Sequence, residues 1–177
     1  TTVASVDIDN ATSGNIEIAE TNAITVLKAV QGTAGNIGIA AGGTITVANG
    51  TTNNAITAAG SGTITLSTSS GGDVLINSSI ESVTGGIVVA ANRVLTIANG
   101  AVIDAGSGTI ALQAQENITL GQVTTTNTST TAVTLTSAVG RIVDGGDTGG
   151  ADVIAGGRLV IDAVTGVGSG NALETTV

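Results

Sequence analysis

Three aspartates in the last third of the sequence are the residues best suited to bind a ligand. Asp144, Asp147 and Asp152 lie in the glycine-rich stretch DGGDTGGAD. Carboxylate oxygens are the hard ligands that calcium prefers, and glycines let a backbone fold closely around an ion. The stretch therefore predicts a calcium site at these three residues, and a solvated surface loop without an ion is the alternative that the sequence leaves open.

The remaining reactive side chains are too few for a catalytic site. The chain has no histidine and no cysteine, and Lys28 is its only lysine. General bases and nucleophiles are therefore restricted to Asp, Glu, Ser and Thr. The four basic residues are scattered along the chain, and no aromatic side chain is present to stack on a sugar ring. We predict that the protein is not an enzyme, that it has no catalytic residues and that it holds no cofactor apart from the calcium considered above.

Composition excludes several classes of partner. Thirteen acidic residues against four basic ones give a net charge of -9, which repels the phosphates of nucleic acids and anionic lipids. The content of hydrophobic residues, 41%, is high enough for a folded core. No apolar run is long enough to span a membrane, and residues 1–10 do not have the pattern of a signal peptide. We expect a folded protein that neither binds nucleic acid nor inserts into a membrane.

A short pattern, Gly-x-aliphatic-x-aliphatic, recurs along the chain. Successive copies begin 21, 27, 23, 23, 23 and 26 residues apart. A near-constant period of this length is the sequence signature of stacked repeats, so the pattern predicts a solenoid. The copies are GNIEI from Gly14, GNIGI from Gly35, GTITL from Gly62, GGIVV from Gly85, GTIAL from Gly108, TAVTL from Thr131 and GRLVI from Gly157.

Each repeat has two further aliphatic positions, which indicate a second and a third strand. Aliphatic residues at positions i and i+2 point to the same side of a strand. The second pairs are Ile24/Val26, Ile45/Val47, Val74/Ile76, Leu95/Ile97 and Ile118/Leu120, with Ile142 in a less regular copy. The third positions are Val30, Ile56, Ile80, Ile103, Val123 and Val153/Ile154.

Units of three short strands are too small to bury their own apolar sides, so they must stack on their neighbours. The expected fold is all-β, a parallel β-helix or β-solenoid of about seven rungs of roughly 21–27 residues with three short strands each. Parallel crossovers are right-handed as a rule, which favours a right-handed coil. Residues 1–177 then form a single β-solenoid module.

The glycine that opens each repeat is expected to allow a positive φ where the chain turns a corner. Asn15 and Asn36 hold matching corner positions, as do Asn49 and Asn99 in two Ala-Asn-Gly turns. Stacked Asn side chains can hydrogen-bond along a solenoid axis, and Asn also tolerates left-handed turns. The sequence leaves both roles open.

Threonines fill much of one outward column on the second strand of the repeats. A single column is not the flat double array of an ice-binding surface, and β-branched residues suit exposed strands in any case. We therefore expect a structural role for this column. It contains Thr25, Thr46, Thr96 and Thr119 and is interrupted by Leu75 and Val143.

The sequence begins and ends with the same three residues, Thr-Thr-Val, at an offset of 174 residues. This offset predicts that the segment is one repeat of a longer tandem array. Neither end has a recognisable cap, and an uncapped solenoid presents open strand edges. We therefore expect stacking on itself or on neighbouring repeats, end to end. Outward valines such as Val88 and Val160 are expected to serve lateral contacts between rods.

The motifs GNIEI, GTITL, SGTIAL and ENITL, together with the stretch GRIVDGGDTGGADVIAGGRLVIDAVTGVGSGNALETTV, carry a family resemblance that covers nearly the whole chain. They resemble the β-helical repeats of filamentous-haemagglutinin-like bacterial surface proteins, which are very large exported adhesins. In that family the repeats form a stalk, and adhesion or toxicity resides in separate domains. The resemblance implies an extracellular or bacterial cell-surface location.

The expected function is that of a structural repeat module in a large secreted or cell-surface bacterial filament or adhesin stalk, self-stacking through open β-helix ends. The lack of cysteine fits an exported repetitive protein. The alternative is an adhesin binding module that recognises a glycan or a protein through the exposed Thr and Asn columns and the protruding loops. The lack of aromatic residues argues against tight sugar binding.

Overall fold

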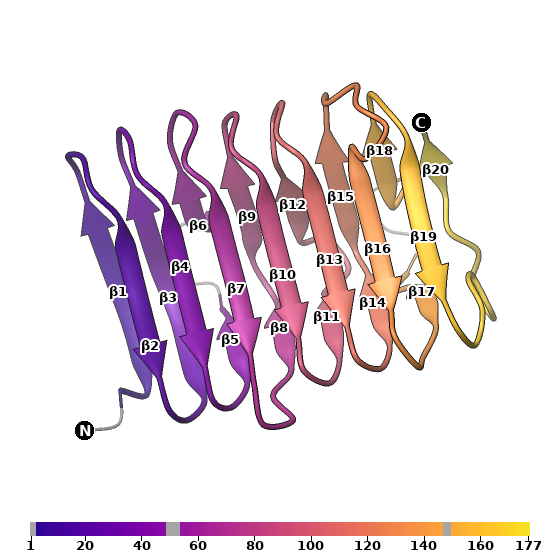
Figure 1. Ribbon diagram of the computed structural model, residues 1–177, viewed down its shortest axis with the longest axis horizontal. Helices are drawn as coiled ribbons and strands as arrows, with labels where there is room; N and C mark the ends of the chain where they lie inside the picture. The colour runs from indigo at the N-terminus through magenta and orange to yellow at the C-terminus, as the bar shows by residue number, and fades with distance from the viewer. Residues whose placement is uncertain (1–2, 49–53, 147–149) are drawn as a thin grey trace.

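The computed structural model describes residues 3–48, 54–146 and 150–177. Within these ranges the chain forms β-strands and no helix, and the strands stack into a β-solenoid of about seven turns (Figure 1). No helix that could cross a membrane occurs in the described residues. The all-β solenoid expected from the repeat is confirmed.

The first strands of the seven turns form one sheet, which faces the viewer in Figure 1. Each strand pairs in parallel with the equivalent strand of the turns before and after it. The strands are β2 (Ile16–Glu20), β4 (Ile37–Ala41), β7 (Ile64–Thr68), β10 (Ile87–Ala91), β13 (Ile110–Ala114), β16 (Val133–Ser137) and β19 (Leu159–Ala163).

The second and third strands of the turns lie behind, in a 13-stranded sheet. The two columns are joined by β3 (Ile24–Gln31), which runs through both positions, and β1 (Ser5–Asn10) pairs with β3 at one end of the stack. The second column continues with β5 (Ile45–Val47), β8 (Val74–Ile76), β11 (Leu95–Ile97), β14 (Ile118–Leu120) and β17 (Ile142–Asp144). The third continues with β6 (Asn54–Ala58), β9 (Ser79–Ser82), β12 (Val102–Asp104), β15 (Gln122–Thr125), β18 (Val153–Ala155) and β20 (Thr175–Thr176).

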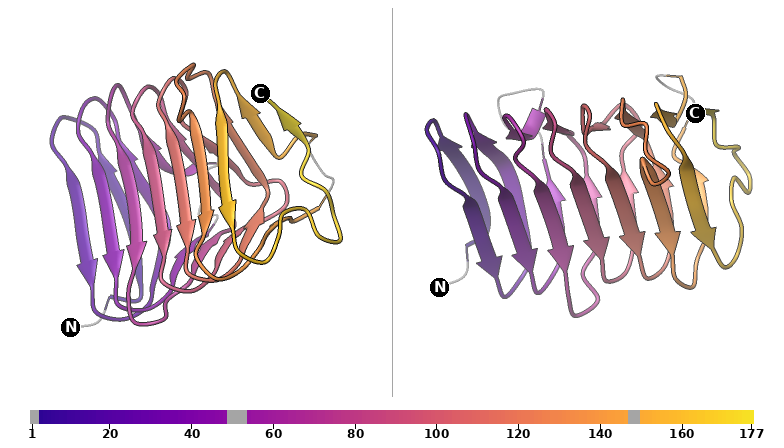
Figure 2. Two further views of the ribbon diagram at one scale, coloured as in Figure 1. Left: turned by 45° about the vertical axis from the view of Figure 1, so that its right-hand side comes forward. Right: turned by 45° about the horizontal axis from the view of Figure 1, so that its top comes forward.

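The coil is right-handed. In Figure 1 the chain runs down the front sheet and up the back sheet while it advances from left to right. Both views in Figure 2 show the two sheets as opposite walls of one flattened coil. The handedness expected from the rule for parallel crossovers is therefore observed.

The core lies between the two sheets and consists of aliphatic residues that stack on their own kind. Ile64, Ile87 and Ile110 are adjacent in register and fully buried, whereas Val88, which points outward from β10, is 39% exposed. Because inward and outward residues alternate along each strand, the period-two interpretation of the sequence is correct. Side chains of this size fill the coil without an aromatic ring.

Two third-strand positions need correction. Ala29, not Val30, lies beside Ile56 and is buried, because two successive half-buried residues, Leu27 and Lys28, shift the alternation of β3 by one residue between the second and the third column. In β18, Val153 is inward and Ile154 is outward with 38% of its surface exposed.

The repeated glycines are required mainly by the close approach of successive turns. Gly14 and Gly35 have positive φ values of 115° and 141°, as expected, but those that follow at this corner do not. A Cβ atom on Gly85 would lie 2.0 Å from the carbonyl oxygen of Gly62, and one on Gly108 would lie 2.0 Å from that of Gly85. Backbone packs directly on backbone here, so only glycine fits.

Polar side chains satisfy the backbone at these corners. The Asn15 Oδ1 atom accepts a hydrogen bond of 2.9 Å from the N–H of Asn36, and the Asn36 Oδ1 atom accepts one of 2.9 Å from Thr63. The hydroxyl of Ser82 donates to the carbonyl oxygen of Gly62 at 2.8 Å and accepts from the N–H of Gly85 at 3.0 Å. Asn15 and Asn36 therefore link consecutive turns, which decides between the two expected roles for this pair. Asn49 lies outside the described residues.

The glycine stack yields a stability prediction. Replacing Gly85 by alanine is expected to lower the free energy of unfolding by about 3 kcal/mol, because the new methyl group meets a backbone carbonyl that cannot rotate away. Chemical denaturation measures the loss. The neighbouring Gly86→Ala is the control, since its Cβ would lie 3.2 Å from the hydroxyl and 3.3 Å from the carbonyl oxygen of Thr109, distances that a shift of a few tenths of an ångström relieves, and it should cost less than about 1 kcal/mol. Equal losses in the two variants would contradict the close-approach explanation.

Candidate functional site

The first residue of the candidate site is an aspartate at an inward position of the second-strand column, where the other turns have aliphatic residues. Asp144 is the last residue of β17 and is only 7% exposed, and its register partner in the turn before is Leu120. The equivalent inward positions of earlier turns are all aliphatic and buried: Val26, Val47, Ile76, Ile97 and Leu120. Asp144 therefore interrupts the apolar column at the sixth turn.

A second aspartate is buried beside it. Asp152 directly precedes β18 and is 2% exposed, and its backbone carbonyl accepts the N–H of Val123 at 2.8 Å. This backbone bond anchors Asp152 to β15 in the turn before. Asp152 and the inward Val153 that follows it are both buried, so strand alternation does not account for the position of Asp152, whose carboxylate lies beside that of Asp144 at the end of β17.

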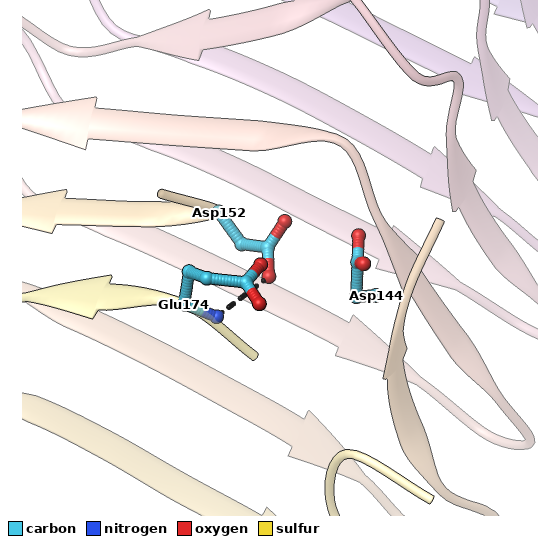
Figure 3. A group of neighbouring side chains, drawn as sticks. All are labelled: Asp144, Asp152 and Glu174. Atoms are coloured by element: carbon cyan, nitrogen blue, oxygen red, sulfur yellow. Dashed lines mark hydrogen bonds between the residues drawn. The ribbon is translucent and has the colours of Figure 1, made fainter. Parts of the chain in front are cut away.

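Glu174 completes the cluster from the last turn. Carboxylate oxygens of Asp144, Asp152 and Glu174 all lie within 4.8 Å of one another. Figure 3 shows the three side chains converging from separate segments, with the backbone N–H of Glu174 donating to Asp152 Oδ2 at 3.0 Å. Two buried acids and one exposed acid therefore meet where the sixth and seventh turns touch.

The calcium prediction named Asp144, Asp147 and Asp152. The structure brings Asp144 and Asp152 together, whereas Asp147 lies outside the described residues. Glu174 was missed because it follows 22 residues after Asp152, beyond the glycine-rich stretch. That separation is close to one solenoid turn, so the repeat length itself was the signal that could have identified it.

Neighbouring groups satisfy part of the cluster. The Asp144 carboxylate accepts the N–H of Gly146 at 2.7 Å and the side-chain amide of Asn171. The two ion pairs found in the described residues lie in other turns, between Lys28 and Asp9 and between Arg93 and Asp73. The donors to Asp144 and Asp152 are therefore neutral groups. The cations of the two ion pairs, Lys28 and Arg93, are bound to other acids.

The pKa of Asp152 is raised from its ordinary value of 3.8 to about 7, and burial is the largest cause. A hydrogen bond with Asp144 and the negative charges of Asp144 and Glu174 contribute to the rise, while the N–H of Glu174 opposes it. Asp152 therefore holds a proton below neutral pH, because its burial and the negative charges of Asp144 and Glu174 disfavour the ionised form.

The three carboxylates offer oxygen atoms of the kind that a hard cation prefers. Calcium takes six to eight oxygen ligands, so three carboxylates supply part of a shell that backbone carbonyls or water would have to complete. Calcium binding at this cluster therefore stays a prediction from the sequence. The structure adds Glu174 to the candidate ligands. Asp152 must lose its proton before it can bind an ion.

Other surface features are less able to bind a ligand. The expected threonine column is present, since Thr25 pairs in register with Thr46, and Leu75 and Val143 interrupt it at the positions foreseen. A shallow groove of about 480 Å³ lies on the outer face of the first-strand sheet, over β2, β4 and β7. It is hollowed by Gly38 and bordered by Glu17, and it contains no aromatic side chain.

Comparison of the chain with protein-family models, with curated proteins and with solved structures finds no match.

Calcium titration tests the metal prediction. Binding is expected to be stronger at pH 8 than at pH 6, because the proton on Asp152 competes with the ion. Isothermal titration calorimetry of the native protein measures it, and Asp152→Asn is expected to remove the heat. The control Asp162→Asn changes an exposed acid on β19 and should leave binding intact. Absence of binding heat at pH 8 would contradict the prediction.

Proposed function

We propose that this protein is a structural module, a rigid β-solenoid that serves as a stalk or filament segment of a large secreted or cell-surface bacterial protein. The observation that supports the proposal is the continuous parallel pairing of equivalent strands along the whole stack. Hydrogen bonds between turns run along the axis, so a load along the rod is shared by many backbone groups.

The dimensions suit a spacer. Neighbouring parallel strands lie about 4.8 Å apart, so seven turns extend roughly 34 Å. The core is aliphatic throughout its central turns, and it needs neither disulfides nor metal to hold those turns together. A chain of such modules would lengthen a rod without any change in cross-section.

Open strand edges support the stacking of modules end to end. In the first-strand sheet β2 and β19 are the two outer strands, and each has a paired neighbour on one side only. Leu159 and Ile161 on β19 point toward the core but are only partly buried, as is Ile18 on β2. The proposal assigns these edges and apolar side chains to contact with a neighbouring repeat or a second copy.

The groove over β2, β4 and β7 favours a second candidate function, an adhesin module that binds a glycan or a protein. Its lining of small and polar side chains, among them Thr65 and Ser67, offers hydroxyl groups to a ligand. The shallow form and the lack of aromatic residues make the structural role the better supported of the two.

The edges provide the test of the structural role. At increasing protein concentration the native chain is expected to form thin rods with a spacing of about 4.8 Å along the axis, as seen by electron microscopy and fibre diffraction. Ile161→Lys places a charge at the exposed end of the core and should abolish the rods, whereas the outward control Val160→Lys on the same strand should not. Circular dichroism and thermal melting check that both variants fold.

A strictly monomeric native chain at all concentrations would argue against stacking through the ends. Glycan-array screening tests the second candidate with the same protein. Binding that is lost in Thr65→Lys, a substitution within the groove, would favour the adhesin module.

A further inference from the structure

The last part of the chain, residues 164–177, fills the second and third columns of the turn that β19 begins. We call it the C-terminal segment. It contacts the sixth turn through an isolated bridge of Val167 with Ile142 and through two residue pairs of β20 with β18. β20 thus follows β18 at the end of the 13-stranded sheet (Figure 1).

The other end of the solenoid has the complementary half of a turn. β1 fills the second and third columns before β3: Ser5 and Val6 pair with the second-column part of β3, and Ile8 to Asn10 pair with its third-column part. Among the described residues, β2 is the outermost strand of the first-strand sheet. One end therefore presents second and third strands, and the other end presents a first strand, β19.

Continuation of the register brings β1 and the C-terminal segment to the same place. In every turn the chain passes from the third column to the first strand of the next turn. A second copy whose β2 follows β19 must therefore bring its β1 onto β17 and β18. The C-terminal segment already occupies those edges, and only one of the two can pair there.

We propose that copies of this chain join by strand exchange, in which β1 of one copy replaces the C-terminal segment of another on β17 and β18 while β2 pairs with β19. This inference rests on the proposed end-to-end stacking and specifies how it occurs. Each copy offers β1 and β2 at one end and receives them at the other. Such a head-to-tail contact repeats without closing and builds a filament.

Apolar side chains at the two ends match across this joint. Of the hydrophobic residues that are only partly buried against the core in the described ranges, all but Ala98 lie in β1, β2, β19 or the C-terminal segment. Ile18 belongs to the same column as Ile161, and Ile8 belongs to the column that ends at Val153. The joint would cover aliphatic side chains with aliphatic side chains in register.

β1 is also better paired than the segment that it would replace. Six residue pairs join β1 to β3, whereas the C-terminal segment has two pairs with β18 and one bridge. Because each parallel pair adds backbone hydrogen bonds, the exchange increases the pairing of β17 and β18.

Asp144 holds the C-terminal segment in place and opposes the exchange. Its carboxylate accepts the side-chain amide of Asn171, and the exchange would place Val6 of the second copy in this column instead. The N–H of Gly146 remains as its polar partner in both states. Asp144 therefore raises the protein concentration at which copies join.

A reversible crosslink tests the exchange. The chain has no cysteine, so Ile154→Cys/Thr176→Cys introduces one pair, at exposed register partners of β18 and β20. Their Cα atoms, about 4.8 Å apart as in neighbouring strands, are within reach of a disulfide. Oxidation of the dilute protein ties the C-terminal segment to β18 and is expected to abolish the rods seen by electron microscopy. Reduction with dithiothreitol should restore them.

The matched control is Thr96→Cys/Thr119→Cys, a pair of outward register partners on β11 and β14 in the middle of the solenoid. Its oxidised form should make rods as the native chain does. Rods from oxidised Ile154→Cys/Thr176→Cys would overturn the exchange but leave end-to-end stacking intact. Absence of rods from the native chain would overturn both.

Asp144→Leu tests the exchange in the opposite direction. It places the residue type of Leu120 in this column and removes the acceptor of Asn171, so the concentration at which rods appear is expected to fall about tenfold. Glu116→Gln removes an exposed acid from a middle turn and should leave that concentration unchanged. An unchanged or higher concentration for folded Asp144→Leu, as checked by circular dichroism, would contradict the proposal.

Discussion

The structure depends on one constraint, the in-register stacking of equivalent residues about 4.8 Å apart along the axis. Every position must accommodate its counterparts directly above and below. At inward positions β-branched and other aliphatic side chains meet this requirement, as the column of Ile37, Ile64, Ile87 and Ile110 shows. At the corner before the first strand the same constraint brings backbone onto backbone, and glycine is the residue that permits it.

The constraint also governs the polar residues. Asn15 and Asn36 are tolerated at adjacent corners because each accepts a hydrogen bond from the next turn. Ser82 is buried because two glycines of neighbouring turns use both functions of its hydroxyl. A buried carboxylate also needs donors from its neighbours. Asp73 accepts the N–H of Val94 in the next turn, and the inward Asp144 accepts the N–H of Gly146 and the side-chain amide of Asn171.

Much of the fold was predictable because each repeat has the same residue pattern and therefore forms the same local geometry. The period located the strands, and the alternation identified inward residues and the outward threonine column. Errors arose where one turn departs from the others, as at Ala29, where the alternation of β3 shifts by one residue between the second and the third column. The candidate site was half predictable: Asp144 and Asp152 are close in sequence, but Glu174 joins them only through a full turn of the coil, and the burial that shifts the pKa of Asp152 is a property of packing.

The position of Asp144 bears on how modules could join. A neighbouring module that continued the second-strand column would place its own residue directly over this carboxylate, in the place now used by the C-terminal segment. The first-strand sheet presents no such obstacle, since Leu159 and Ile161 continue the aliphatic column to the edge of β19. Stacking in that column requires only another aliphatic strand, whereas stacking in the second column requires either a polar partner for Asp144 or its protonation. The two columns therefore differ in what they require of a neighbouring strand, because β19 presents aliphatic side chains whereas the second column ends in the carboxylate of Asp144.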